Sequence, residues 1–517
     1  MPSRVLPSFL LLLQVVAAVV VPTPNRVHDV NGENADLGVP VPDSDAKAQL
    51  VTGSVREDYS HILEIDVPGS AGYVSSSTYA DPYVMSPLGG VPTPLPAPVA
   101  EPPVDPSQQL GGTSGGFTPG YRSVGYFVNW GVYQRSFFPK DLTPDQFTHI
   151  NMAFLKFEPA TGQVTMADEF AEVKKDMGFT GTSPDQAMGV VDQLFRLKQQ
   201  YRNVKTIVSI GGWTYCQDSL FATAVNSPEK RATFAKSAVG FVVNYGMDGI
   251  DLDWEYPATE VDALNYVDLL RLCREELDKV NPNFELTIAA PCGLSKVNVL
   301  RIAEMDQYLD FWNVMAYDFA GGWGKNAGHS ANFFPSGDNP ASTEFSYVEA
   351  LDEYLKNGVD PRKIVTGIPV YGHGFTNTDG PGTPFSGVGK GSWEEGILDY
   401  GDLSLGGNNI HEDEQLLASW TYDPESRYMV SFDTPKITRL KAKFIVDRGL
   451  GGAMFWETSA DNSTVDGNMI HTLIETLGGV TALEQKQNII DYPGSKYSNI
   501  RVFDGKFITW ANPQYNN

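Results

Sequence analysis

The chain has 517 residues, of which 42% are hydrophobic and 19% are charged, so it is long enough for one large domain or two to three ordinary ones. Its 63 acidic and 37 basic residues give a formal net charge of -26, which would repel a phosphate backbone and argues against nucleic acid as a partner. The three cysteines allow at most one disulfide and lack the C-x-x-C spacing of structural zinc sites.

The N-terminus has the pattern of a secretion signal. Arg4 supplies a positive start, and an interrupted apolar run extends from Leu6 to Val21. A membrane span needs about 20 apolar residues, and this run is shorter and broken. We therefore predict a signal peptide over residues 1–21, a secreted, extracellular protein and no membrane partner.

Residues 22–119 are rich in proline and glycine. Their densest part is the run P-T-P-L-P-A-P-V-A-E-P-P-V-D-P from Pro92 to Pro106. Such a composition cannot bury enough apolar surface to offset the entropy lost on ordering. We predict a disordered, acidic, proline-rich extension and linker.

From Ser123 onward, short apolar runs alternate with amphipathic stretches. This pattern predicts strand and helix units around a parallel sheet. Eight strands are expected, over residues 123–129, 149–154, 205–210, 249–255, 285–290, 311–316, 364–370 and 452–456. The helices are expected over residues 185–200, 228–245, 259–279, 347–356, 435–448 and 469–477. The fold class is therefore α/β, a (β/α)8 TIM barrel whose active site lies at the carboxyl ends of the strands.

One interval breaks the alternation. Between Val370 and Pro435 no strong helix is visible, whereas glycines, aromatic residues and short apolar pieces are common. A structureless loop of that length would count against the barrel. We predict a small α+β insertion domain over residues 371–434, between strands 7 and 8. The barrel itself is expected over residues 120–493, followed by a C-terminal tail over residues 494–517.

The fourth predicted strand carries an unusual row of acids, in the sequence D-G-I-D-L-D-W-E-Y from Asp248 to Tyr256. Because side chains alternate along a strand, Asp251, Asp253 and Glu255 share one face and the apolar residues between them share the other. In a barrel the three acids would point inward. Burying acids is costly unless they share protons, accept hydrogen bonds or bind a metal.

Four interpretations compete for this row. Solvated surface acids would not be interleaved with isoleucine, leucine and tryptophan. A calcium loop needs glycine at its sixth position, where this sequence has Tyr256. A magnesium or dinuclear metal site stays open, although no histidine lies near the motif. The fourth interpretation is acid/base catalysis, in which neighbouring carboxylates shift one another's pKa values apart so that one acid stays protonated near neutral pH. We favour the last and expect no metal and no cofactor.

The same row resembles the D-x-x-D-x-D-x-E signature of family 18 glycoside hydrolases, and the whole barrel resembles a secreted chitinase of the fungal or bacterial type. Three other motifs match in order, namely S-I-G-G-W at Ser209 to Trp213, M-A-Y-D at Met315 to Asp318 and M-F-W-E at Met454 to Glu457. The resemblance extends over residues 123–492. It implies retaining hydrolysis of β-1,4-linked N-acetylglucosamine in chitin, in which the substrate's own acetamido group attacks.

The resemblance also implies a role for each catalytic residue. Glu255 would be the general acid and base, and Asp253 would orient the acetamido N–H. Asp251 would share a proton with Asp253, and Tyr317 would donate its hydroxyl to the acetamido carbonyl. The expected substrate-binding residues are Trp456, Met315, Asp318, Tyr126, Phe154, Trp213, Tyr256, Trp323 and His373.

Two residues near the cleft carry separate expectations. The stretch P-V-Y-G-H-G-F places His373 where the family usually has arginine, which should make binding more sensitive to pH. Cys216, just past Trp213, is expected to be an unreactive buried thiol that packs as a small apolar residue.

Two other functions stay open. An endo-acting enzyme on the N-acetylglucosamine core of N-glycans would use the same chemistry. A chitin-binding lectin on the same barrel would typically lack the glutamate, whereas Glu255 is present. In each case the expected partner is chitin or an N-acetylglucosamine oligomer, and we expect a monomer.

Overall fold

The structure is a computed structural model that describes residues 120–178, 183–403, 409–462, 467–502 and 505. The predicted signal peptide and the predicted proline-rich extension lie outside these residues.

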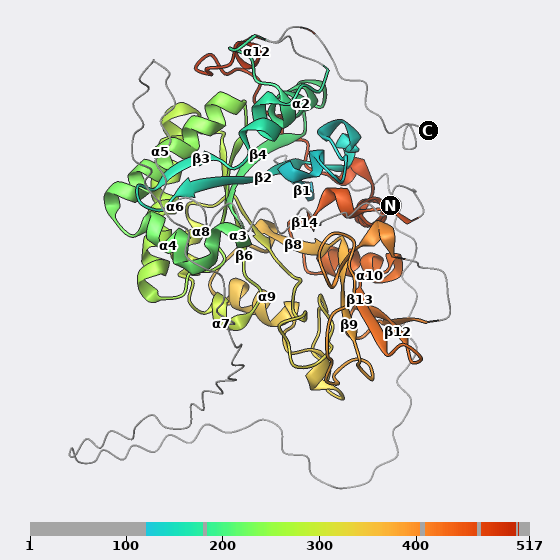
Figure 1. The fold of residues 1–517 in the computed structure, drawn as a ribbon. Helices are drawn as coiled ribbons and strands as arrows, with labels where there is room; N and C mark the ends of the chain where they lie inside the picture. The colour runs from blue at the N-terminus through green and yellow to red at the C-terminus, as the bar shows by residue number, and fades with distance from the viewer. Residues whose placement is uncertain (1–119, 179–182, 404–408, 463–466, 503–504, 506–517) are drawn as a thin grey trace, which may run out of the picture. The chain divides into compact units, whose positions relative to one another are not determined.

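Eight parallel strands form a closed barrel (Figure 1). Around the barrel they follow the order β1-β14-β8-β7-β6-β5-β4-β2, and pairing between β1 and β2 closes the ring. A short antiparallel strand, β3 (Gln163–Met166), extends β2 as a hairpin. The predicted TIM barrel is therefore confirmed. The barrel strands are β1 (Arg122–Val128), β2 (His149–Glu158), β4 (Lys205–Gly211), β5 (Gly249–Asp253), β6 (Glu285–Ala290), β7 (Phe311–Val314), β8 (Ile364–Pro369) and β14 (Gly452–Trp456).

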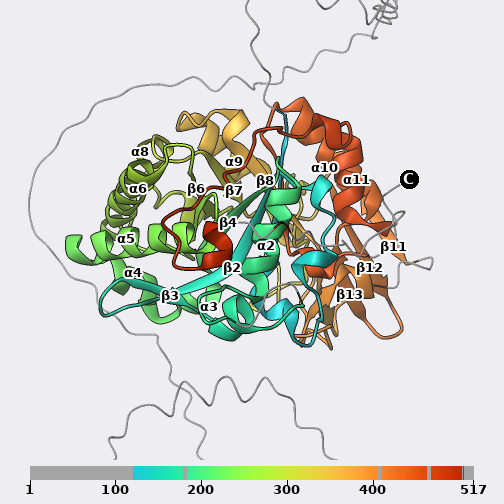
Figure 2. The same cartoon turned by 90° about the horizontal axis from the view of Figure 1, so that it is seen from above.

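Helices cover the outside of the barrel. In Figure 2, α4, α5, α6 and α8 lie along one side, and α10 and α11 lie along another. None of the helices in the described residues is long and apolar enough to cross a membrane. The helices are α2 (Gly189–Gln200), α3 (Trp213–Cys216), α4 (Leu220–Val225), α5 (Pro228–Tyr245), α6 (Glu260–Val280), α7 (Leu294–Val297), α8 (Ile302–Asp306), α9 (Tyr347–Lys356), α10 (Pro435–Asp447), α11 (Met469–Leu477) and α12 (Ser498–Arg501).

Local sequence explains where α5 begins and ends. The hydroxyl of Ser227 accepts a hydrogen bond from the backbone N–H of Lys230, and Pro228 occupies the first helical position. Gly246 ends the helix with a φ of 67°, which residues with a side chain rarely adopt. Both ends agree with the prediction.

Side chains alternate along β5 between an apolar region outside the barrel strands and a second region inside the barrel. Ile250 and Leu252 face outward and join the large core between strands and helices. Asp251 and Asp253 alternate with them and face the barrel interior. A second, smaller apolar cluster lies inside the barrel, where it includes Val124, Tyr126, Met315, Tyr317 and Met454.

The strand β5 ends two residues earlier than predicted. Its last pair with β6 joins Leu252 to Ile288, and its last pair with β4 joins Gly211 to Asp253. The backbone N–H of Gly212 then donates to the Asp253 carbonyl at 2.9 Å, as β4 turns into α3. Glu255 consequently lies just beyond the ladder, on the rim of the barrel.

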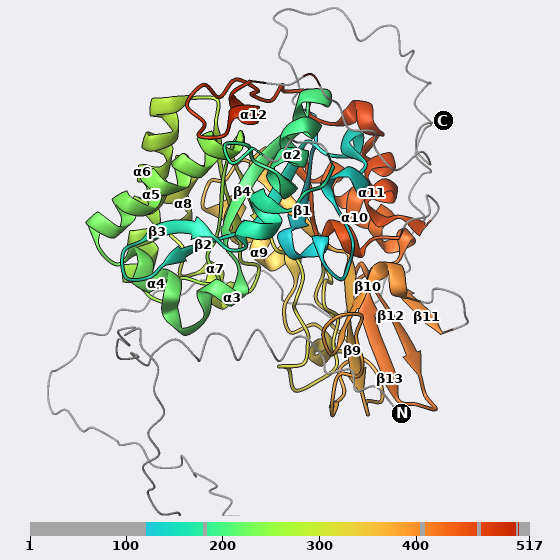
Figure 3. The ribbon, with the colours of Figure 1, turned by 45° about the horizontal axis from the view of Figure 1, so that its top comes forward.

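A five-stranded antiparallel sheet is inserted between β8 and β14, the seventh and eighth barrel strands, as predicted. Its strand order is β10-β9-β13-β12-β11, and it projects from one side of the barrel in Figure 3. The first of its strands, β9, directly follows β8. The strands are β9 (Tyr371–Thr376), β10 (Ile397–Asp399), β11 (Ile410–Asp413), β12 (Ala418–Asp423) and β13 (Tyr428–Phe432).

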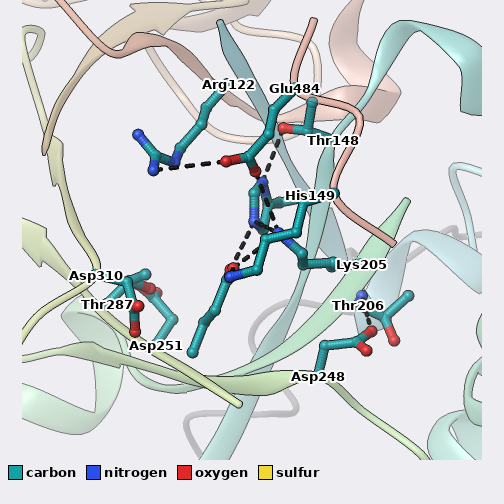
Figure 4. Close-up of polar contacts among 12 residues, drawn as sticks. Arg122, Thr148, His149, Lys205, Thr206, Asp248, Asp251, Thr287, Asp310 and Glu484 are labelled. Carbon is teal, nitrogen blue, oxygen red and sulfur yellow. Dashed lines mark hydrogen bonds and ion pairs between the residues drawn. The ribbon is translucent and has the colours of Figure 1, made fainter. Parts of the chain in front are cut away.

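The amino ends of the barrel strands surround a buried network of charges (Figure 4). Glu285 contacts His149 at 2.7 Å and Lys205 at 2.7 Å, and Lys205 also contacts Glu484 at 3.2 Å. Glu484 belongs to the segment that follows α11, and Arg122 lies 3.7 Å from its carboxylate. We call these five residues the floor network.

The segment that follows Glu484 in the chain stays packed against the barrel. The side-chain amide of Asn488 donates to the Val204 carbonyl at 2.6 Å, and the Tyr492 hydroxyl donates to the Met247 carbonyl at 2.6 Å. Asn499 and Ile500, which fall in the predicted C-terminal tail, are also buried. The described part of the predicted tail, residues 494–502 and 505, thus includes residues that belong to the packed core.

Candidate active site

Asp251 lies at the centre of the barrel interior and is completely buried. Its Oδ2 accepts hydrogen bonds from the hydroxyls of Tyr126 at 2.8 Å and Ser209 at 2.7 Å. Its Oδ1 accepts from the Thr287 hydroxyl at 2.7 Å and from the Asn313 amide at 3.3 Å. Burial raises the pKa of Asp251, and these donors act in the opposite direction. Four different strands thus hold this one carboxyl group.

Asp253 follows on the same face of β5 and has a different environment. Burial raises its pKa well above the usual value, and the charges of Glu255 and Asp251 raise it further. Its Oδ1 is buried and has no hydrogen-bond partner within the described protein. A buried acceptor without a partner is costly, so this oxygen is available for a donor supplied by a ligand.

Glu255 is the third acid of the row and lies on the rim. Burial raises its pKa to about 7, and the charge of Asp318 contributes to the rise. Hydrogen bonds from the Tyr256 side chain and the Trp213 backbone oppose it. A carboxyl group with a pKa near 7 can carry a proton at neutral pH and release it, which is the requirement for a general acid and base.

Residues after β7 bring a second group of side chains to the row. Tyr317 is buried, and its hydroxyl contacts the sulfur of Met454 at 3.6 Å. Met315 is buried in the same interior cluster. Asp318 has a φ of 58°, and its Oδ1 contacts the Tyr371 hydroxyl at 2.6 Å and Nε2 of His373 at 2.8 Å. The inserted sheet, through β9, therefore contacts the loop that carries Tyr317.

Aromatic rings line the interior at the carboxyl end of the barrel. Trp456 lies 5.7 Å from Phe154 in a stacked arrangement and 5.4 Å from Tyr126 edge-on. Tyr256 packs against the same interior cluster. The structure thus brings together eleven of the thirteen predicted site residues in one connected region, namely Asp251, Asp253, Glu255, Tyr317, Trp456, Met315, Asp318, Tyr126, Phe154, Tyr256 and His373.

The other two predicted residues, Trp213 and Trp323, lie at the margin. Their side chains are 61% and 66% exposed, which excludes them from the apolar interior. Trp323 contacts the ring of His373 edge-on at 5.4 Å, and the backbone of Trp213 contacts Glu255. Both tryptophans are placed to meet a ligand that extends beyond the interior.

Sequence reasoning did not select two features of this region. Tyr371 belongs to the P-V-Y-G-H-G-F stretch, yet its contact with Asp318 depends on how β9 folds back. Arg135 pairs with Asp399 at 2.5 Å and with Glu457 at 3.4 Å, and its guanidinium lies 5.0 Å from the Trp393 ring. Arg135, Asp399 and Trp393 line a cavity of about 260 Å³. No motif signal pointed to Arg135, because its partners are distant in the chain.

Within the described residues, His149, Glu285 and Glu484 are spaced closely enough to hold a metal ion. Lys205, however, contacts both carboxylates with its ammonium group and lies 3.5 Å from the His149 ring nitrogen. The lysine supplies the positive charge that a metal would bring. We therefore assign this group to an ion-pair network.

Comparison with known proteins agrees with this geometry. Residues 122–461 match the model of the glycosyl hydrolases family 18. The chain belongs to this family.

Relatives and solved structures of the family cover most of the barrel. "Chitinase 1" of Aphanocladium album is 41% identical over 392 residues, which cover 74% of this chain and 90% of that protein. "Endochitinase 1" of Metarhizium robertsii is 41% identical over 396 residues, with the same coverage. The structure of chitinase ChiA74 from Bacillus thuringiensis superimposes with a TM-score of 0.66 at 29% identity and covers 71% of each chain. The resemblance seen in the sequence is confirmed, and this family 18 protein is a glycoside hydrolase.

Proposed function

We propose that this family 18 enzyme is a secreted chitinase that hydrolyses β-1,4-linked N-acetylglucosamine by a retaining, substrate-assisted mechanism. One observation carries the proposal. Glu255, whose pKa is raised to about 7, lies next in the row to Asp253, whose buried Oδ1 has no partner. A proton donor for the glycosidic oxygen and a free acceptor for an amide N–H are the two groups that cleavage beside an acetamido sugar requires.

In the first step the proton of Glu255 passes to the glycosidic oxygen while the C1–O bond breaks. The acetamido carbonyl oxygen forms a bond to C1, which gives a positively charged oxazolinium ring. Asp253 accepts the acetamido N–H, and its negative charge stabilises that ring. The buried hydroxyl of Tyr317 donates to the acetamido group and fixes its direction.

In the second step water opens the ring. The Glu255 carboxylate takes a proton from the water as its oxygen bonds to C1, and the acetamido group is regenerated. Configuration at C1 is retained because C1 is inverted twice. Asp251, held by four donors, shares a proton with Asp253, and when Asp251 holds this proton Asp253 carries the negative charge that stabilises the ring.

The test is Glu255→Gln. The amide keeps the shape of the side chain but cannot release a proton, so kcat on chitin oligomers should fall by several orders of magnitude, on the order of 10³ or more, with binding nearly intact. Near-normal turnover would exclude this role for Glu255. The matched control is Glu172→Gln, because Glu172 is a second buried carboxyl group with a pKa of about 7, and its partners are the turn at residues 167–168, Tyr245 and the Asn129 amide. This control should keep the wild-type kcat.

Substrate assistance has its own test. Asp253→Asn should reduce kcat, and fully deacetylated glucosamine oligomers should be poor substrates because they lack the attacking carbonyl oxygen. Equal rates on acetylated and deacetylated oligomers would exclude the mechanism.

Activity should also survive exhaustive EDTA treatment, and a loss restored by magnesium or calcium would favour metal chemistry instead. Cleavage of N-glycan cores in preference to chitin oligomers would assign the other substrate.

We further propose export through the segment 1–21 and an accessory role for residues 22–119, with residues 120–493 as the catalytic unit. Deleting residues 22–119 should leave the melting temperature and activity on soluble oligomers unchanged. A large fall in melting temperature would show instead that this segment stabilises the barrel.

A further inference from the structure

The backbone that carries the acids leaves the β ladder before it reaches Glu255. The last residue of β5 with a partner on β4 is Asp253, and pairing with β6 ends at Leu252. Although the Gly212 N–H donates to the Asp253 carbonyl at 2.9 Å, the described residues show no strand pairing to this segment beyond this point. Buried N–H groups of this kind need another acceptor.

The thiol of Cys216 meets this need. Its Sγ lies 3.2 Å from the backbone N–H of Glu255, which donates to it, and 3.4 Å from the Asp253 carbonyl, to which the thiol donates. Cys216 is the last residue of α3 and is buried. A single side chain thus links the main chain on both sides of the Trp254 peptide unit.

The thiol is suited to this double role because it stays protonated. Burial raises the pKa of Cys216, and the charges of Asp253 and Glu255 raise it further. A neutral S–H donates weakly and its sulfur accepts weakly, so both contacts can form at once. In the same core cluster as Cys216, the ring of Trp254 stacks on Phe221 with the ring centroids 4.8 Å apart. The segment that carries Glu255 is therefore held both by the thiol and by this ring stack.

We propose that Cys216 is a positioning residue for the reaction, whose thiol accepts the Glu255 N–H beyond the end of the ladder, adds a second donor to the Asp253 carbonyl and fixes the direction of the Glu255 carboxyl group. This inference rests on the proposed function of Glu255. It assigns Cys216 no contact with substrate, so its loss should affect kcat and spare KM. Small displacements of a proton donor reduce transition-state stabilisation more than they reduce binding.

The experiment compares three variants at Cys216 with the wild-type enzyme on soluble N-acetylglucosamine oligomers. Cys216→Ala and Cys216→Val remove both hydrogen bonds, and the second fills the space of the thiol with methyl groups in case the cavity left by the first prevents folding. Each should lower kcat about tenfold or more and leave KM within about twofold. Cys216→Ser keeps a donor and an acceptor and should restore kcat to within about threefold of wild type.

The other two cysteines provide matched controls. Cys273 and Cys292 are also buried free thiols, and among the described contacts neither has a hydrogen bond to the acid row. Cys273→Ala and Cys292→Ala should lower the melting temperature at least as much as Cys216→Ala and keep the wild-type kcat.

Three results would overturn the inference: wild-type kcat in Cys216→Ala and Cys216→Val, an equal loss of kcat in the control variants, or no recovery in Cys216→Ser. A wild-type enzyme with no activity on any N-acetylglucosamine oligomer would instead reject the proposed function itself. The two failures are therefore distinguishable.

Discussion

Nε2 of His373 lies 2.8 Å from Oδ1 of Asp318, so β9 of the inserted sheet contacts the loop after β7 through this pair as well as through Tyr371. The His373 side chain is 4% exposed and the Asp318 side chain is 47% exposed. The pair thus has a buried base and a partly solvated acid. Asp318 is also one of the charges that raise the pKa of Glu255, which connects the inserted sheet to the proposed general acid.

Replacing His373 with arginine tests this connection. Imidazole changes its charge near neutral pH, whereas a guanidinium group is always charged. We expect His373→Arg to change KM for chitin oligomers, because the longer guanidinium fork cannot occupy the place of the ring between Asp318 and Trp323. KM is the measurement, with the melting temperature as the control. An unchanged KM with a shifted melting temperature would mean that His373 serves stability alone.

The pH dependence of kcat/KM should report the proton on Glu255. Because burial raises the pKa of this residue to about 7, activity should fall above about pH 7 as the general acid loses its proton. Asp318→Asn removes a negative charge that contributes to the rise, so the pKa of Glu255 should fall and the basic limb should move to lower pH, by up to about one unit. Asp379→Asn, in the exposed segment after β9, should leave the limb in place. A limb that stays in place or moves to higher pH in Asp318→Asn would contradict this account.

The floor network should make stability depend on pH. Burial alone would raise the pKa of Glu285, but Lys205 and His149 lower it well below its usual value, while burial lowers the pKa of His149. Both shifts mean that the unfolded chain binds more protons at acidic pH. The free energy of unfolding should therefore decline as pH falls from about 6.5, where a free histidine titrates, and decline further below about 4.3, where a free glutamate titrates.

Glu285→Gln should expose this contribution. Removing one partner from a buried pair costs about 3–5 kcal/mol, so the free energy of unfolding at pH 7 should fall by that amount and vary less with acid than in the wild type. Denaturant unfolding at pH 4, 5.5 and 7 measures both effects. Glu169→Gln breaks an ion pair whose side chains are more than half exposed, and it should change little. Equal acid sensitivity in Glu285→Gln and wild type would reject the assignment.

The segment near the C-terminus should contribute to stability and not to catalysis. Asn499 accepts a hydrogen bond from the backbone N–H of Ala187 at 2.9 Å and donates to the carbonyl of the same residue at 2.8 Å. Asn499→Ala leaves both buried groups unpaired and should lower the free energy of unfolding by about 1–3 kcal/mol. Val502→Ala, at a side chain that is 72% exposed, is the control. A change in kcat with unchanged stability would contradict this role.

The alternation of apolar runs with amphipathic stretches was sufficient to predict the barrel. The alternation of side chains along one strand was sufficient to predict the inward row of acids, because it depends only on neighbouring residues. The motifs at the ends of four strands then converge wherever parallel strands close into a barrel. The early end of β5 could not be predicted from the sequence, because it depends on where the neighbouring strands β4 and β6 turn away. The contacts of Asp318 with His373 and of Cys216 with Glu255 join residues from different elements, and no local pattern records such pairs. Residues after Gly494 lacked any periodic signal, although Asn499 and Ile500 pack into the core.

The first barrel strand has partners that come from nearly the other end of the chain. Arg122 pairs with Gly452, and Tyr121 exchanges backbone hydrogen bonds with Ala482 and Glu484. During synthesis, one edge of β1 therefore stays unpaired until β14 and the segment after α11 have left the ribosome. An unpaired strand edge is a template for association with other chains. A nascent chain stalled before Gly452 would consequently expose two open edges, β1 and β8, and would depend on chaperones to remain soluble.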